Sequence, residues 1–205
     1  MAANEVGVVE SQALSFSQEI GSGDLVSVIK EVADSVVEIK TQSLVMSQWP
    51  MNQGYVAEGA GSGVIITEQG HIVTNWHVAE DAQELTVRLN DGSEYPAQLL
   101  AYDEKTDLAL LKIEADNLVS ASLADSDEVQ VGQQVFAIGN PLGQLGGTVT
   151  EGIISATSRE ITVDNQTMTL LQTSAAVNSG NSGGGLFDSK GNLVGIINAK
   201  SSGIG

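Results

Sequence analysis

Short apolar segments, separated by turns rich in Gly, Asn and Asp, run through the chain from about residue 36 to its end. Their Val, Ile, Leu and Thr content is typical of β-strands. No regular alternation of strands with helices is present, which excludes a doubly wound parallel sheet. The pattern therefore predicts an all-β protein. The expected strands are 36–40, 63–67, 71–75, 85–89, 94–102, 108–113, 134–139, 148–157, 168–173 and 192–200.

These strands fall into two groups, separated by the polar stretch ADSDEVQVG at 124–132. Within the first group, NDGSE at 90–94 is a strong hairpin signal. Two runs of short strands predict two packed, six-stranded-type β-barrels, the first at about 35–123 and the second at about 124–205.

The N-terminal part is predicted differently. Residues 1–22 are polar and aperiodic, which indicates a flexible segment, and 23–205 form the expected folded domain. A short helix is expected from Asp24, a good N-cap, because Leu25, Ile29, Val32 and Val36 recur at helical spacing.

The two ends of the chain lead to further expectations. No basic segment followed by a long apolar run is found, so no signal peptide or membrane span is expected. The protein is then either cytoplasmic or begins after a removed anchor. The second group has fewer strands than the first and the chain stops at SSGIG, so we expect a truncated C-terminal end.

Charge and composition exclude several classes of function. The 26 acidic and 8 basic residues give a net charge of −18, which opposes binding to nucleic acid or to anionic membranes. Cysteine is absent and only two histidines are present, so a disulfide framework and a structural zinc site are not expected. No cofactor or metal is predicted.

The stretch NSGNSGGGLFD at 178–188 places Ser182 among glycines. By itself this is either a plain turn or a loop that presents a nucleophile. In the second case, the backbone N–H groups of Gly180 and Ser182 can converge on one point, with Asn181 as the bend between them. Such a pair of donors would form an oxyanion hole beside the hydroxyl.

A nucleophilic serine needs a base and a group that orients that base. His77 follows an expected strand at the rim of a barrel, whereas His71 lies within that strand and is the weaker candidate. Asp107 directly precedes the apolar segment 108–113, where its carboxylate can be partly sheltered. Asp103 competes with it but lies further out in the turn.

The segments TNWHV, TDLALLKI and GNSGG, in the order His, Asp, Ser, resemble the trypsin-like serine endopeptidases of the HtrA (Deg) family. The resemblance covers roughly residues 24 to 205 and includes GSGVII, ADSDEVQVGQQVFAIGNPLG, TVTEGIISA and LQT. It implies a double β-barrel with the site between the barrels. His77 would be the general base and acid, Asp107 its orienting group, Ser182 the nucleophile, and the amides of Gly180 and Ser182 the oxyanion hole.

The sequence departs from the family pattern at three positions. Gly185 follows GNSGG and Ser179 precedes it, where the family usually has proline, and Ser174 stands where aspartate is common. We expect each change to loosen a loop that the reaction needs to be rigid.

The resemblance also frames specificity. In chymotrypsin-like folds the residue six before the serine lies at the base of the specificity pocket; here it is Ala176, with Val177 beside it. Small or medium aliphatic side chains are therefore expected before the cleaved bond. The edge formed by Asn198, Ala199 and Lys200 is expected to pair with the substrate backbone, although Lys200 is equally an ordinary solvated residue.

Family members commonly act outside the cytoplasm, in the periplasm or cell envelope, form trimers and carry a C-terminal PDZ domain, which this sequence does not contain. The apolar segment 45–58 is either a partner contact or a loop that folds back on its own barrel. The predicted function is endoproteolysis of unfolded or misfolded proteins. The alternatives are a catalytically silent, chaperone-like or peptide-binding module on the same fold, and a purely structural β-domain.

Overall fold

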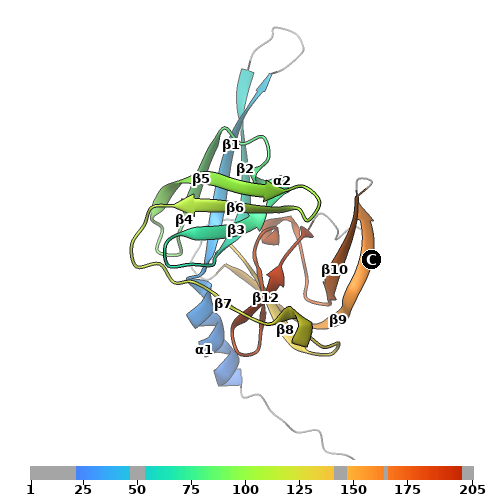
Figure 1. Cartoon of the computed structure of the whole chain (residues 1–205). Helices are drawn as coiled ribbons and strands as arrows, with labels where there is room; N and C mark the ends of the chain where they lie inside the picture. Colours follow the sequence, from blue (N-terminus) through green and yellow to red (C-terminus); the bar gives the residue numbers. More distant parts are fainter. Residues whose placement is uncertain (1–21, 47–53, 141–146, 164–165, 200–205) are drawn as a thin grey trace, which may run out of the picture.

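The computed structural model describes residues 22–46, 54–140, 147–163 and 166–199, and most of them lie in two sheets. In the first, six strands close a barrel in the spatial order β1-β2-β3-β6-β5-β4 (Figure 1). Its strands are β1 (Val36–Met46), β2 (Gly54–Ile65), β3 (His71–Asn75), β4 (Glu84–Arg88), β5 (Glu94–Asp103) and β6 (Leu108–Ile113).

The second sheet also has six strands, in the order β10-β9-β8-β11-β12-β7. It lies below the barrel in Figure 1 and curves into a barrel-like layer. Its strands are β7 (Ser122–Leu123), β8 (Gln134–Gly139), β9 (Thr148–Val163), β10 (Gln166–Thr173), β11 (Gly185–Asp188) and β12 (Asn192–Ile196). The predicted all-β, trypsin-like architecture is confirmed, although β7 joins the second sheet just before the predicted division at 124.

Helical structure in the described ranges is limited to four short elements: α1 (Ser22–Ala33), α2 (Trp76–Ala79) and the 3₁₀ turns η1 (Ser126–Glu128) and η2 (Ser179–Asn181). The expected helix is present, but its predicted limits were wrong. It begins at Ser22, so Asp24 lies in the first turn, and it ends before Val36, which opens β1. The hydroxyl of Ser35 donates to Val32 O at 2.6 Å and stops the helix there.

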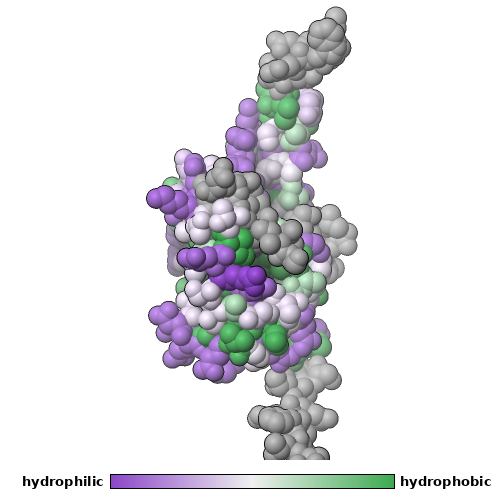
Figure 2. Space-filling model, turned by 90° about the vertical axis from the view of Figure 1, so that its right-hand side faces the viewer, coloured by the Kyte–Doolittle hydropathy of each residue, from purple (hydrophilic) through white to green (hydrophobic). Residues whose placement is uncertain are grey.

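Several strands are longer than the apolar pattern predicted. β1 and β2 run on as an antiparallel arm that pairs residues 42–46 with 54–58 and projects from the barrel (Figure 1). At its described end Leu44, Tyr55 and Val56 are exposed, and the surface there is hydrophobic (Figure 2). Residues 47–53 of the apolar segment lie outside the described residues. Backbone pairing holds this arm, so its strands carry no buried stripe that a sequence pattern could reveal.

Strand β11 was not predicted, because the whole stretch 178–188 was interpreted as a plain turn or a loop that presents a nucleophile. The strand lies between β8 and β12, and Phe187 is fully buried with its ring 5.8 Å from that of Phe136. Gly185 is therefore the first residue of an internal strand rather than part of a loop. A side chain at Gly185 would meet the ring of Phe187 and Leu193.

Three apolar clusters fill the interior. One lies inside the barrel around Ile39, Ile72 and Leu111. A second cluster contains residues of both sheets and of α1, among them Val64, Phe136 and Phe187. A third lies within the second sheet around Val135, Ile154 and Val194. Because the second cluster contains residues from both sheets, apolar burial fixes one sheet against the other.

Gly183, in the turn before β11, lies directly against the barrel. This residue has φ +81°, and a Cβ there would collide with the carbonyl oxygen of Ser62 in β2 and with the hydroxyl of Thr74 in β3. Glycine is needed at 183 for its backbone angle and for the lack of a side chain.

We expect Gly183→Ala to destabilise the fold by more than its φ angle alone explains. Gly132 has φ +90° and no atom within 4 Å of the place that a Cβ would occupy, so Gly132→Ala measures the angle without the collision. Gly132→Ala should lower the free energy of unfolding by about 1–2 kcal/mol. Gly183→Ala should cost at least about 3 kcal/mol, because backbone must move as well. Equal losses in urea unfolding of the two variants would contradict the close approach.

A second prediction concerns Glu38, a nearly buried carboxylate on β1 opposite Arg88 of β4. Burial raises its pKa above the ordinary 4.5, and Lys40 and Arg88 only partly oppose this. The folded protein therefore binds a proton at Glu38 more tightly than the unfolded chain does. The contribution of Glu38 to the free energy of unfolding falls as pH rises above about 4.5. Stability of the wild type relative to Glu38→Gln should fall between about pH 4 and pH 7.

Glu94→Gln is the control for that comparison. The hydrogen bond from Lys40 lowers the pKa of Glu94, so stability from Glu94 is lost as pH falls below about 4.5, the opposite trend. Urea unfolding of the three proteins at a series of pH values measures both slopes. Parallel profiles for the wild type and Glu38→Gln would refute the assignment.

Candidate active site

The first half of the site comes from the barrel, where Asp107 precedes β6 and His77 lies on α2. Asp107 has φ +53°, an unusual backbone angle for a residue other than glycine. Its carbonyl oxygen accepts hydrogen bonds from the N–H of Trp76 at 3.0 Å and from the side chain of Asn75 at 3.1 Å. These bonds hold the turn before β6 against the start of α2.

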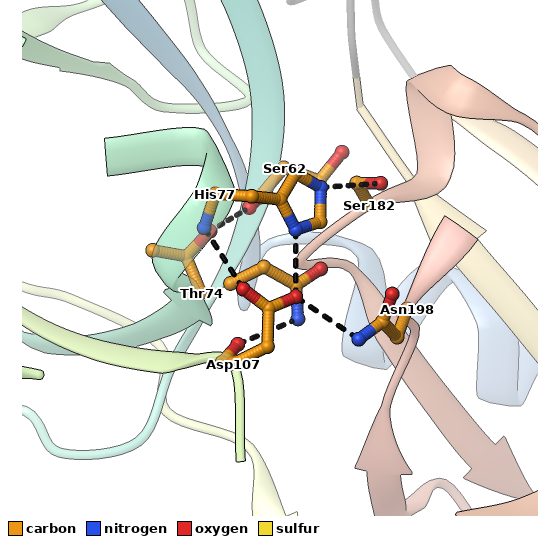
Figure 3. Close-up of polar contacts among 7 residues, drawn as sticks. Ser62, Thr74, His77, Asp107, Ser182 and Asn198 are labelled. Carbon is orange, nitrogen blue, oxygen red and sulfur yellow. Dashed lines mark hydrogen bonds and ion pairs between the residues drawn. The ribbon is translucent and has the colours of Figure 1, made fainter. Parts of the chain in front are cut away.

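The carboxylate of Asp107 is directed at His77 (Figure 3). Oδ1 accepts from the backbone N–H of His77 at 2.9 Å, and Oδ2 lies 2.6 Å from His77 Nδ1. Because an ionised carboxylate only accepts, Nδ1 carries the proton and Nε2 is left as the acceptor. Only 7% of the Asp107 surface is exposed, so the pair is sheltered from water.

The second half comes from the other sheet. His77 Nε2 lies 3.2 Å from Oγ of Ser182, so the imidazole stands between Asp107 and Ser182 (Figure 3). The structure thus brings together the three residues that the sequence singled out, across 105 residues of chain between His77 and Ser182. Such an arrangement can remove the proton of the hydroxyl as it attacks.

The two competing residues lie elsewhere. His71 is the first residue of β3, and its Nδ1 is 2.7 Å from the hydroxyl of Thr67. Asp103 is exposed at the end of β5, where it accepts from the N–H of Lys105. Both have local structural roles, as the sequence led us to expect.

Residues 178–184, hereafter the nucleophile turn, carry Ser182 at the end of η2. The side chain of Asn178 accepts from the N–H of Gly180 at 3.2 Å, and its carbonyl accepts from the N–H of Asn181 at 2.9 Å. In this structure the Gly180 donor is engaged within its own turn. The oxyanion hole at Gly180, Asn181 and Ser182 stays a prediction, and it requires Gly180 N–H to exchange Asn178 for a substrate oxygen.

Asn198 has a contact that the sequence did not indicate. Its amide donates to Asp107 Oδ2 at 2.9 Å, from the side opposite His77 (Figure 3). Substrate pairing was predicted for Asn198 as part of the edge 198–200 of the expected strand 192–200, whereas β12 ends at Ile196. No local pattern could have shown this contact, since 91 residues separate the two side chains.

Of the predicted specificity residues, Ala176 contacts the nucleophile turn. Ala176 is exposed, and its carbonyl accepts from the side chains of Thr150 at 2.8 Å and Asn181 at 3.3 Å. Val177 and Ala199 are half-buried, and Lys200 lies outside the described residues. The structure does not test their contact with substrate.

Ser174, one of the departures from the family pattern, has a defined contact. Its hydroxyl accepts from the N–H of Ile153 at 3.0 Å, and its own N–H donates to the carbonyl of Ile153 at 3.0 Å. This residue is therefore fastened to β9 by two hydrogen bonds. The side chain of Ser179 lies outside the described residues.

Two further findings concern other kinds of site. Among the residues that the structure describes, no three His, Cys, Asp or Glu side chains are grouped as ligands for a metal ion. No helix in the described ranges has the length and apolar character that crossing a membrane requires.

Comparison with known proteins gives consistent matches. Residues 61–196 match the model of the trypsin-like peptidase domain family. A Halomonas elongata protein named "Probable periplasmic serine endoprotease DegP-like" is 50% identical over 149 residues, which are 72% of this chain and 31% of the relative. The "Serine protease Do-like HtrA" of Lactococcus lactis subsp. cremoris is 37% identical over 97% of this chain and 54% of the relative.

Solved structures agree. The structure of the HtrA-type protease AlgW with a tripeptide superposes with a TM-score of 0.73 and 41% identity, over 84% of this chain and 53% of that one. The chain thus spans about a third to about half of the relatives it matches. With the fold, the three aligned side chains and these matches together, the chain belongs to the trypsin-like peptidase domain family and has HtrA- and Deg-type serine proteases as relatives.

Proposed function

We propose that the chain is a serine endopeptidase that works through an acyl-enzyme. The observation that carries this proposal is the position of His77, with Nδ1 at 2.6 Å from Asp107 and Nε2 at 3.2 Å from Ser182. One imidazole is thereby bonded to a carboxylate and to a hydroxyl at the same time. A purely structural domain gives no reason for that alignment.

In the proposed reaction, Ser182 Oγ attacks the carbonyl carbon of the scissile peptide while His77 Nε2 takes the hydroxyl proton. The imidazolium then donates this proton to the leaving amine, and an ester to Ser182 remains. Water attacks the ester in the second half, with His77 again accepting a proton and returning it to Ser182. Asp107 keeps the ring in the required tautomer and stabilises its positive charge.

The oxyanion that forms in both halves is assigned to the N–H groups of Gly180 and Ser182. Asn181 is the bend between them, and its own N–H and side chain are bonded to Asn178 and Ala176. Substrate binding would release Gly180 N–H from the Asn178 side chain. This exchange requires the Asn178 side chain or the peptide plane of Gly180 to move.

Substrates are proposed to be unfolded or misfolded proteins, whose extended backbone could pair with residues 198–200 as an added strand. Ala176 and Val177 leave room for a small or medium aliphatic side chain before the cleaved bond. Relatives named as probable periplasmic serine endoproteases support a location outside the cytoplasm, in the periplasm or cell envelope. A role in protein quality control is part of the same proposal. Assembly into homotrimers or larger oligomers belongs to the same proposal.

A catalytically silent, peptide-binding module is the second candidate. The engaged Gly180 N–H favours it, because a site whose oxyanion donor is occupied by its own side chain is at rest until that bond is exchanged. The two candidates differ in one measurable property, which is whether Ser182 reacts with an electrophile.

Fluorophosphonate labelling measures that reactivity. We expect the wild type to be labelled at one serine and to cleave unfolded casein, and Ser182→Ala to show neither, a loss of at least about 10³-fold in rate. Ser62 and Ser35 remain as internal control hydroxyls in the same variant. A wild type that binds casein without being labelled would establish the silent module instead.

Asn198→Ala tests whether Asn198 acts through Asp107. Removing a donor to a charged acceptor should lower kcat by about tenfold or more with little change in KM, because the backbone at 198 is unaltered. Asn192→Ala is the matched control, since its amide donates to Asp188 at 3.1 Å in the β11–β12 turn. If Asn198→Ala raised KM and left kcat unchanged, its side chain would belong to substrate binding.

A further inference from the structure

Ser62 lies in β2 of the barrel but contacts the nucleophile turn of the other sheet. It is fully buried, and its neighbours in sequence, Gly61 and Gly63, lack side chains. Neither the sequence motifs nor the proposed reaction gives it a role. Figure 3 draws Ser62 behind His77, with a hydrogen bond from Thr74.

Every hydrogen-bonding group of Ser62 has a partner. Its N–H donates to the carbonyl of Ser182 at 2.8 Å, and its carbonyl accepts from the hydroxyl of Thr74 at 2.7 Å. Its own hydroxyl donates to the carbonyl of Gly180 at 3.0 Å and accepts from the N–H of Asn140 at 2.8 Å. One residue of the barrel thus contacts the second sheet through three hydrogen bonds.

The direction of the hydroxyl bond is determined by its partners. The N–H of Asn140 can only donate, so the hydroxyl must use its single proton toward Gly180. The result is a chain from Asn140 N–H through Ser62 Oγ–H to the Gly180 carbonyl, in which each bond polarises the next. This chain connects the end of β8 with the nucleophile turn.

The two carbonyls held by Ser62 belong to the peptide units on either side of the Asn181–Ser182 peptide. Fixing both restricts the rotation of the backbone that carries the Ser182 N–H and Oγ. Because His77 belongs to the barrel, the same contact sets the nucleophile relative to its base. Gly183 allows the approach, since any side chain there would collide with Ser62 and Thr74.

We propose that Ser62 is a positioning residue for acyl transfer. Its hydroxyl holds the nucleophile turn so that Ser182 Oγ lies at the distance from His77 Nε2 that the reaction needs. It does not touch the reacting atoms. This inference rests on the proposed function. The simpler reading is that the hydroxyl only satisfies two buried backbone groups, which would affect stability and nothing else.

Ser62→Ala and Ser35→Ala distinguish these readings. Ser35 is also fully buried and its hydroxyl also bonds a carbonyl, that of Val32, but it lies at the end of α1. Both variants should lower Tm, Ser62→Ala more than Ser35→Ala, because the Ser62 hydroxyl bonds two backbone groups and the Ser35 hydroxyl one. We expect only Ser62→Ala to slow fluorophosphonate labelling and to lower kcat, by about 10- to 100-fold with KM changed less than about threefold, as misplacement of a reacting group predicts.

Amide hydrogen exchange gives a readout that is independent of activity. The N–H of Gly183 donates to the carbonyl of Ile197 and that of Gly184 to the carbonyl of Asn181. Both should exchange at least about tenfold faster in Ser62→Ala than in the wild type, and at the wild-type rate in Ser35→Ala, because local opening becomes easier.

The outcomes separate the two claims. A wild type that is neither labelled nor active refutes the proposed function, while the exchange rates still decide the role of Ser62. The inference is overturned if Ser62→Ala is labelled, and exchanges its amide hydrogens, at the wild-type rates. It is also overturned if Ser35→Ala loses as much labelling and amide protection as Ser62→Ala. If Ser62→Ala does not fold, Ser62→Thr decides: a folded variant with wild-type labelling supports the role of the hydroxyl, and a folded variant with slow labelling contradicts it.

Discussion

The contact between His77 and Ser182 joins the two sheets of the domain. Neither sheet contains all three residues of the proposed catalytic triad, since Asp107 and His77 come from the barrel and Ser182 from the second sheet. The 3.2 Å distance is therefore set by the way the sheets dock rather than by any local turn. Burial of the apolar cluster around Val64 and Phe136 stabilises the packing of one sheet on the other. The hydrogen bonds of Ser62 and the close approach at Gly183 fix how the two sheets are aligned.

Asp107, in the turn before β6, has a nearly buried carboxylate. Taking Asp107 out of water would be unfavourable without compensation. The N–H and Nδ1 of His77 and the amide of Asn198 provide that compensation, the last of them from the second sheet. Docking therefore completes the hydrogen bonding of Asp107 as well as delivering Ser182. The orienting group and the nucleophile depend on the same interface.

The sequence predicted features that depend on neighbouring residues and missed features that depend on tertiary contacts. Strands β3, β6 and β8 have the predicted limits, since their buried faces leave an apolar pattern in the chain. The outer halves of β1 and β2 leave none, because backbone pairing alone holds them. His77, Asp107 and Ser182 were found because each lies beside a strand end or glycine run. Asn198 was predicted only to pair with substrate, and Ser62 had no predicted role, because no local sequence pattern accompanies their contacts with Asp107 and Gly180.

The Asn178 side chain that caps Gly180 N–H has a consequence for how substrate binding energy would be divided under the proposed mechanism. When a neutral substrate carbonyl replaces the neutral Asn178 oxygen, one ordinary hydrogen bond is exchanged for another. The enzyme–substrate complex therefore gains little binding free energy from this contact. The tetrahedral intermediate presents a negative oxygen to the same donor, and hydrogen bonds to ions are about twice as strong as those between neutral groups. The hydrogen bond from Gly180 to Asn178 thus lowers the affinity of the site for the substrate in its ground state. It does not weaken the preference of the site for the charged intermediate over the substrate.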